Sequence, residues 1–95
     1  MTRPQAKATL QHDDERVRVT RFDFQPGEET GHHRHEYSYV IVPITDGKLL
    51  IEDSSGSREA ALDAGVSYAR PAGVEHNVVN RGDRPLSFVE IELKG

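Results

Sequence analysis

Turns recur along this chain at short intervals, and their spacing is the feature that most constrains its fold. Glycine, proline and small polar residues mark them at 26–27, 45–47, 53–57, 63–65, 71–73 and 81–85. The segments between the turns are rich in β-branched and aromatic residues, and none has a sustained helical period. Short strands separated by turns about every 8–12 residues are typical of an antiparallel sandwich or barrel. The sequence therefore predicts an all-β fold.

The length and composition bound the possible functions. The 95 residues suffice for one domain, with residues 1–15 as a polar arm or short edge strand and residues 16–95 as the barrel. The 12 basic and 16 acidic residues are scattered, with a formal charge of −4, so no basic stripe predicts a nucleic-acid partner. The chain has no cysteine, which excludes disulfides, thiolate zinc sites and cysteine nucleophiles. No segment has the pattern of a signal peptide or membrane span, so a soluble cytoplasmic protein is expected.

Residue parity predicts which strand side chains face the core. Val17 and Val19 have the opposite parity to Phe22 and Phe24, so we expect a bulge or two short strands near residues 20–21.

Two further expectations concern the middle and the end of the chain. Residues 45–47 are expected to form a hairpin turn, with Gly47 available for positive φ and residues 48–52 returning as the partner strand. In the last strand, residues 86–93, the apolar face carries Val89, Ile91 and Leu93. Glu90 and Glu92 are then expected in solvent, with orientation of a ligand histidine as the alternative.

A cluster of histidines carries the main chemical signal. His32, His33 and His35 lie together, and His33 and His35 share one face of an extended strand. Two imidazoles so placed can bind one metal ion, and His76 is a candidate for the third ligand. A solvated surface cluster is the alternative interpretation. His32, on the opposite face, is expected to point outward.

Two stretches resemble the sequence motifs of the cupin family. Residues 65–80 match the second cupin motif, G-x5-P-x-G-x2-H-x3-N, at every fixed position: Gly65, Pro71, Gly73, His76 and Asn80. The first motif, G-x5-H-x-H-x3–4-E-x6-G, is matched at Gly27, His33, His35 and Gly47. The resemblance covers residues 16–93 and is to small single-domain bacterial cupins, with a weaker likeness to those associated with β-alanine degradation. It implies an antiparallel jelly-roll barrel that holds a metal ion at its mouth.

The chain departs from the first motif where the family has a glutamate ligand. Tyr39 or Val40 occupies that place, depending on the gap that is counted. The resemblance therefore implies a metal site of His33, His35 and His76 without a carboxylate, for iron, zinc, nickel or manganese. Three neutral ligands leave the ion at +2 and leave coordination positions open, as a catalytic metal requires.

Two tyrosines beside this site are candidate catalytic residues. Tyr37 and Tyr39 could hydrogen-bond to a metal-bound water or a substrate, with simple barrel filling as the alternative. Arg70 could face the pocket and attract a carboxylate, or lie exposed on its strand.

Three functions follow from these features. The first is a metalloenzyme of oxygenase or isomerase type that acts on a small carboxylate or thiol through the three-histidine centre. The second is a non-catalytic, metal-dependent protein that binds or senses a small molecule, and the third is an accessory protein whose histidines are a relic. The sequence leaves open whether the chain is an enzyme. Exposed edge strands and a small core favour a homodimer.

Overall fold

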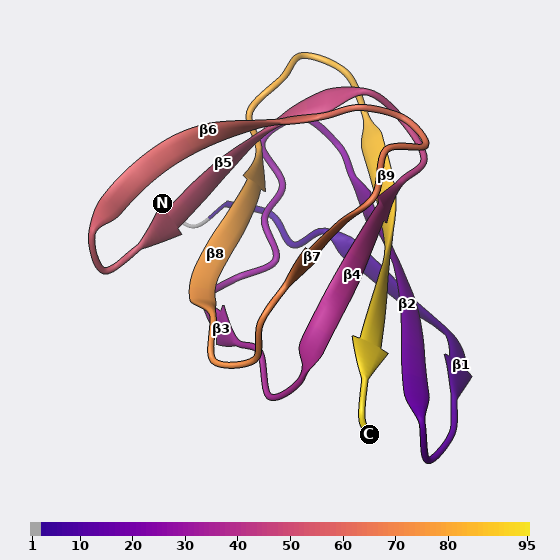
Figure 1. The fold of residues 1–95 in the computed structure, drawn as a ribbon. Coiled ribbons are helices and arrows are strands. Elements are labelled where there is room, and N and C mark those ends of the chain that lie inside the picture. Colours follow the sequence, from indigo (N-terminus) through magenta and orange to yellow (C-terminus); the bar gives the residue numbers. More distant parts are fainter. Residues whose placement is uncertain (1–2) are drawn as a thin grey trace.

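The computed structural model describes residues 3–95, which form nine β-strands and no helix (Figure 1). The strands are β1 (Lys7–Asp13), β2 (Val17–Phe24), β3 (His33–Arg34), β4 (Ser38–Pro43), β5 (Gly47–Asp53), β6 (Gly56–Leu62), β7 (Tyr68–Arg70), β8 (Glu75–Asn80) and β9 (Leu86–Leu93). Accordingly, the described residues include no helix that is long and apolar enough to cross a membrane.

The strands form two antiparallel sheets that enclose the core. One sheet has the order β1-β2-β9-β4-β7, and the other has the order β3-β8-β5-β6. Figure 1 shows the two sheets curving around a shared interior, with β3 and β8 on one side and β4, β7 and β9 on the other. The predicted all-β jelly-roll barrel is thus confirmed.

The hydrophobic core occupies one end of this interior. Phe22 and Phe88 pair across β2 and β9, and their ring centroids are 5.4 Å apart. Phe24 and Leu86, the next inward-facing pair, are each only 1% exposed. Other buried apolar side chains come from both sheets, namely Ala6, Tyr39, Ile41, Leu49, Leu62, Val78 and Val79.

Strand β2 is continuous, and the bulge expected near residues 20–21 is wrong. Its register with β9 runs unbroken from Val17 to Phe24. The register shift lies instead in β1, which pairs with β2 at the edge of the sheet, between Leu10 and His12. Val17 and Val19 face outward from the sheet, and the phenylalanines of β2 face inward, so one regular strand carries apolar residues on both faces.

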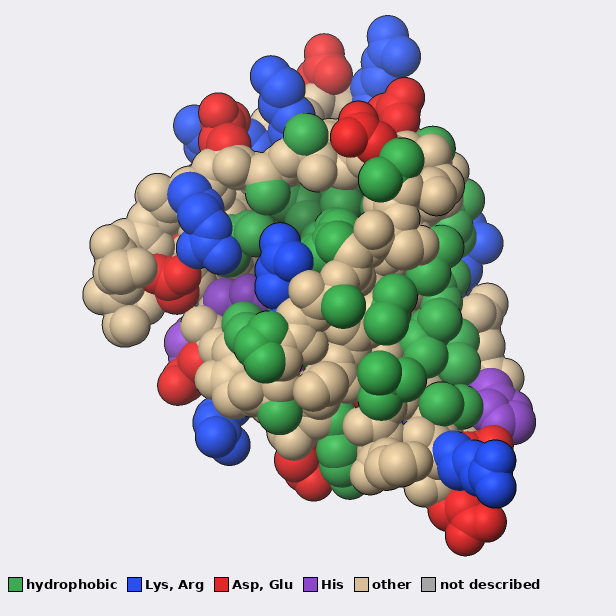
Figure 2. Space-filling view, viewed as in Figure 1, with side chains coloured by type: hydrophobic (Ala, Val, Ile, Leu, Met, Phe, Trp, Pro, Cys, Tyr) green, Lys and Arg blue, Asp and Glu red, His purple; other side chains and the backbone are tan. Residues whose placement is uncertain are grey.

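Strand β9 also carries apolar residues on its outer face, and its orientation is the reverse of the expected one. Glu90 and Glu92 are buried, with 8% and 9% of their surface exposed, whereas Leu93 is 45% exposed. Val89 and Ile91 are half-buried on the outer face of the sheet. Figure 2 shows hydrophobic side chains gathered over the part of the molecule where β4 and β9 run. The prediction that these two glutamates lie in solvent is therefore wrong.

The expected hairpin at residues 45–47 is also wrong. Strand β4 pairs with β7 and β9, whereas β5 pairs with β6 and β8 in the other sheet. Gly47 is not among the glycines with positive φ. A Cβ atom there would lie 2.9 Å from Cδ2 of Leu86, so this position requires glycine because the chain passes close to a buried side chain.

Candidate metal centre

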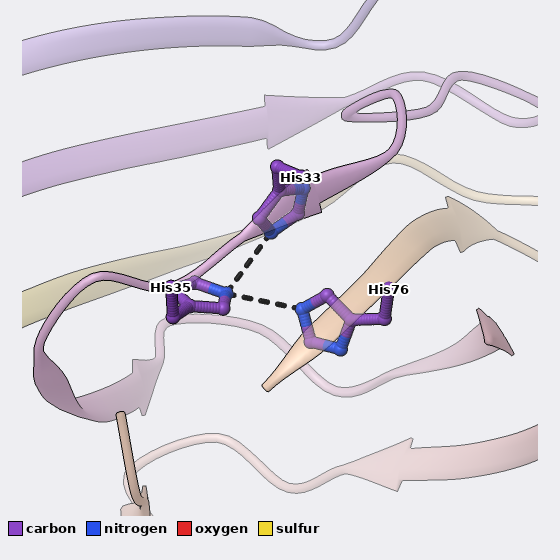
Figure 3. Close-up of side chains that lie close together, drawn as sticks. All are labelled: His33, His35 and His76. Carbon is purple, nitrogen blue, oxygen red and sulfur yellow. Dashed lines mark hydrogen bonds between the residues drawn. The ribbon is translucent and has the colours of Figure 1, made fainter. Parts of the chain in front are cut away.

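Three histidines converge at the open end of the barrel, opposite the phenylalanine core. His33 lies in β3, His76 lies opposite it in β8, and His35 follows β3 directly. Nε2 of His35 is 3.0 Å from Nε2 of His33 and 3.1 Å from Nε2 of His76 (Figure 3). Among residues 3–95, this is the one group of three or more His, Asp or Glu side chains arranged to hold a metal ion.

Backbone hydrogen bonds hold His35 in place although β3 ends one residue before it. The amide of His35 donates to the carbonyl of Val74 at 2.8 Å, and the amide of Gly73 donates to the carbonyl of His35 at 2.8 Å. Gly73 has a φ of 95°, which an L side chain rarely adopts. The turn glycine of the second motif thus fixes a histidine of the first.

The hydrogen bonds of His33 favour one tautomer of its ring. Nδ1 of His33 is 2.9 Å from the carbonyl oxygen of Gly31, which can only accept a hydrogen bond. The proton therefore belongs on Nδ1, and Nε2 presents its lone pair to the other two histidines. A backbone carbonyl that orients a ligand histidine in this way is common in metal sites.

The contacts among the three imidazoles suit a shared cation better than hydrogen bonds. A neutral ring nitrogen carries either one hydrogen or one lone pair, so Nε2 of His35 cannot bond fully to both of its neighbours. Two nitrogens that each lie about 2.1 Å from one tetrahedral zinc ion are about 3.4 Å apart, and the three ring nitrogens here lie within 4.8 Å of one another. The donor set and its spacing therefore fit a divalent transition metal.

The buried histidines are neutral at physiological pH. Burial, and then the nearby His33, lower the pKa of His35 from 6.5 to about 4. Burial, and then His33 and His35, lower the pKa of His76 to about 4. Neutral imidazole is the form that binds metal, so the site does not have to lose protons at these two residues first.

A buried carboxylate lies behind His35. Oε1 of Glu90 is 3.8 Å from Nδ1 of His35, on the side of the ring away from the other histidines. Burial, and then the charge of Glu92, raise the pKa of Glu90 to about 7. Glu92 itself accepts two hydrogen bonds from Arg18, at 2.9 and 2.6 Å. Sequence reasoning favoured a solvated Glu90 and gave a place beside a ligand histidine only as the alternative, although Glu90 shares the parity of Phe88, which faces the core.

The two candidate tyrosines lie in different places. The ring of Tyr39 stacks on His35 with centroids 3.8 Å apart, and burial raises the pKa of its hydroxyl to about 12. Tyr37 is half-buried in the bend before β4 and does not line the cavity. A catalytic role for either tyrosine stays a prediction. His32 lies outside the cluster, exposed, with Nε2 2.9 Å from Glu75.

The histidines open into a cavity of about 530 Å³ inside the barrel. Aromatic and aliphatic side chains form much of its wall, and Glu90, Glu92 and several arginines supply its polar groups. Figure 2 shows this hollow with hydrophobic side chains at its base, Lys and Arg side chains at its rim and histidine at its edge. Its size and lining are those of a small-molecule site.

Comparison with known proteins decides the family. Residues 20–92 match the family model of the cupin domain. The chain belongs to the cupin family. This cupin is 54% identical over 92 residues to the "Beta-alanine degradation protein BauB" of Pseudomonas aeruginosa, with 97% of each chain covered.

Solved structures give the same result. The crystal structure of a cupin domain from Bordetella pertussis is 56% identical, has a TM-score of 0.96 and matches 100% of this chain and 99% of its own. A double-stranded β-helix protein from Klebsiella pneumoniae, at 22% identity, shares the fold with a TM-score of 0.78 over 96% of this chain and 78% of its own. The resemblance inferred from the two motifs is therefore confirmed.

Proposed function

We propose that this cupin binds one divalent transition metal ion through His33, His35 and His76 and is an enzyme of oxygenase or isomerase type. Its substrate in this proposal is a small carboxylate or thiol, and its metal is iron, zinc, nickel or manganese. The observation that carries the proposal is the convergence of three Nε2 atoms at the wall of a cavity of small-molecule size. The bound ion would supply Lewis-acid or redox chemistry and open coordination positions.

The protein side chains around the histidines support a catalytic role. Glu90, with a pKa of about 7, can accept or donate a proton near neutral pH within the same cavity. The hydroxyl of Tyr39 keeps its proton and can donate a hydrogen bond to an anionic group. The apolar walls limit the water that reaches these groups, which strengthens the electrostatic interactions among them.

The name of the relative from Pseudomonas aeruginosa supports the substrate class. That protein is called a β-alanine degradation protein, and β-alanine is a small carboxylate with an amino group. We infer that this cupin serves the same kind of catabolism, with a substrate that carries a carboxylate.

Elemental analysis of protein purified without a histidine tag tests the metal site. The wild type is expected to hold about one equivalent of metal, and the His33→Ala/His76→Ala double variant is expected to hold none. His32→Ala is the matched control because His32 is exposed and lies outside the cluster. Absence of metal from reconstituted wild type, or an equal loss in the control, would refute the proposed site.

The nature of the metal then separates the two reaction types. Iron that is lost in the double variant would support an oxygenase, and oxygen uptake with small carboxylates and thiols as substrates would test it directly. Zinc or nickel would favour an isomerase.

A non-catalytic binding protein is the second candidate. It is favoured by the ligand set, because no carboxylate among residues 3–95 joins the three histidines. Saturable binding of small carboxylates by the metal-loaded protein, without turnover of any of them, would favour this role over the enzyme.

A further inference from the structure

Four arginines line the cavity, and two of them are already neutralised. Arg18 is bonded to Glu92 through both oxygens of the carboxylate, and Arg58 donates to Asp53 at 2.8 Å. Within the described range 3–95, no carboxylate oxygen lies within 4.0 Å of the other two, Arg34 and Arg70. These two cations face the cavity without a partner of opposite charge from that range.

Arg70 is the better anchored of the two. Its guanidinium carbon lies 4.6 Å from the centroid of the Tyr68 ring, and its Nη1 donates to the carbonyl of Ala69 at 2.8 Å. Arg70 is an exposed residue, and these contacts leave its Nε and Nη2 edge without a hydrogen-bond partner from residues 3–95. Such an edge matches the two oxygens of a carboxylate.

The position of Arg70 relates it to the metal site. Arg70 in β7 pairs directly with Tyr39 in β4, and the ring of Tyr39 stacks on His35. Paired residues on neighbouring strands have Cβ atoms about 5 Å apart. Arg70 and His35 are thus both neighbours of Tyr39, and all three side chains line the same cavity.

We propose that Arg70 binds the carboxylate of a short-chain organic acid whose opposite end reaches the three-histidine centre. The inference rests on the proposed function for the second half of this statement, and the arginine–carboxylate contact stands without it. The wall between the two polar ends includes Ile41, Ile51 and Phe88. An unbranched chain of a few carbons fits such a wall, and a second charge in the middle of the ligand does not.

Titrations followed by NMR test this proposal with three ligands of equal chain length. Propionate has only the carboxylate, propylamine has only the amine, and β-alanine has both. Each is added to metal-free and to zinc-loaded protein, as wild type, Arg70→Gln and Arg70→Lys. Arg84→Gln is the matched control because Arg84 is exposed and does not line the cavity, and Arg34→Gln tests the other unpaired cation.

We expect Arg70→Gln to weaken binding of propionate and β-alanine about tenfold or more, because it removes a charge-assisted, two-point contact. Arg70→Lys should keep part of the affinity, and Arg84→Gln all of it. Propylamine should bind the wild type and Arg70→Gln equally weakly. The zinc content of Arg70→Gln should equal that of the wild type.

Three results would overturn the assignment. One is that the wild type binds propionate no better than propylamine. Another is that Arg34→Gln lowers the affinity for propionate more than Arg70→Gln does. The third is that Arg70→Gln and Arg84→Gln lower the affinity for propionate equally. If the proposed metal site is wrong, the wild type will hold no zinc. The titrations of the metal-free protein still test the role of Arg70 in that case.

Discussion

The buried carboxylate of Glu90 gives a prediction that can be worked from the structure. In the metal-free protein, burial and the nearby Glu92 raise the pKa of Glu90 from 4.5 to about 7. A group whose pKa is raised by folding binds its proton more tightly in the folded state. Its contribution to stability is therefore fully present below pH 4.5 and is lost as the pH rises to 7 and above.

The substitution Glu90→Gln removes this loss because glutamine has the shape of the protonated acid but cannot ionise. The rise of the Glu90 pKa from 4.5 to about 7 corresponds to a loss of roughly 3 kcal/mol in the free energy of unfolding at high pH. We expect the variant to equal the wild type near pH 4.5 and to exceed its free energy of unfolding by up to that amount at pH 8.5. The gain should appear progressively between these two pH values.

Urea unfolding in the presence of a chelator, at pH 5 and at pH 8.5, measures the effect. Glu15→Gln is the control, since Glu15 is an exposed glutamate in the turn between β1 and β2. Destabilisation by Glu90→Gln at pH 8.5, or a gain of the same size at both pH values, would refute the reasoning.

Three further predictions concern packing, acid stability and assembly. Gly47→Ala should lower the free energy of unfolding by about 1–3 kcal/mol because the new Cβ overlaps a buried leucine, whereas Gly82→Ala, with 3.5 Å of space, should be close to neutral in the same urea experiment. The metal-free protein should lose stability as the pH falls from 6.5 to 4, because His35 and His76 take up protons in the unfolded state before they do so in the folded state. Glu90 has the opposite effect, but the two histidines together outweigh it. Unchanged urea midpoints between pH 7 and pH 5 would contradict this prediction. We propose a homodimer that pairs through the apolar outer face of the larger sheet. Light scattering should give a mass of two chains for the wild type and a mass of one chain for Ile91→Glu.

The sequence predicted the fold and the histidine cluster because both depend on local spacing. Turn residues and alternating strands determine an antiparallel barrel. The fixed offsets of the two motifs place His33 and His76 on neighbouring strands and His35 directly after the first of them. The hairpin at Gly47 was wrong because its geometry depends on Leu86, nearly forty residues later in the chain. No pattern within residues 37–52 shows that β4 and β5 separate into different sheets.

The orientation of β9 could not be read from alternation alone. Its outer face is apolar and its inner face carries two glutamates, so a count of hydrophobic residues favours the wrong side. The useful signal lies in the partner strand, where Arg18 has the same parity as Phe22. A partly buried arginine–glutamate pair then explains how Glu92 can face inward without an isolated charge.

The pairing of β2 with β9 explains why the core and the site share one set of inward-facing positions. Along the pair, the inward residues change from Phe22 and Phe88 to Thr20 and Glu90, and then to Arg18 and Glu92. The carboxylate missing from the first motif is thus not replaced by a new ligand, because Glu90 faces Nδ1 of His35 rather than the converging Nε2 atoms. An ion held by three neutral imidazoles would keep its full charge, while Glu90 lies 3.8 Å behind the ring of His35 as a nearby acid. In the proposed function, the motif histidines would bind the metal, and proton transfer would fall to Glu90, a residue of the core strand β9 that lies outside both motifs.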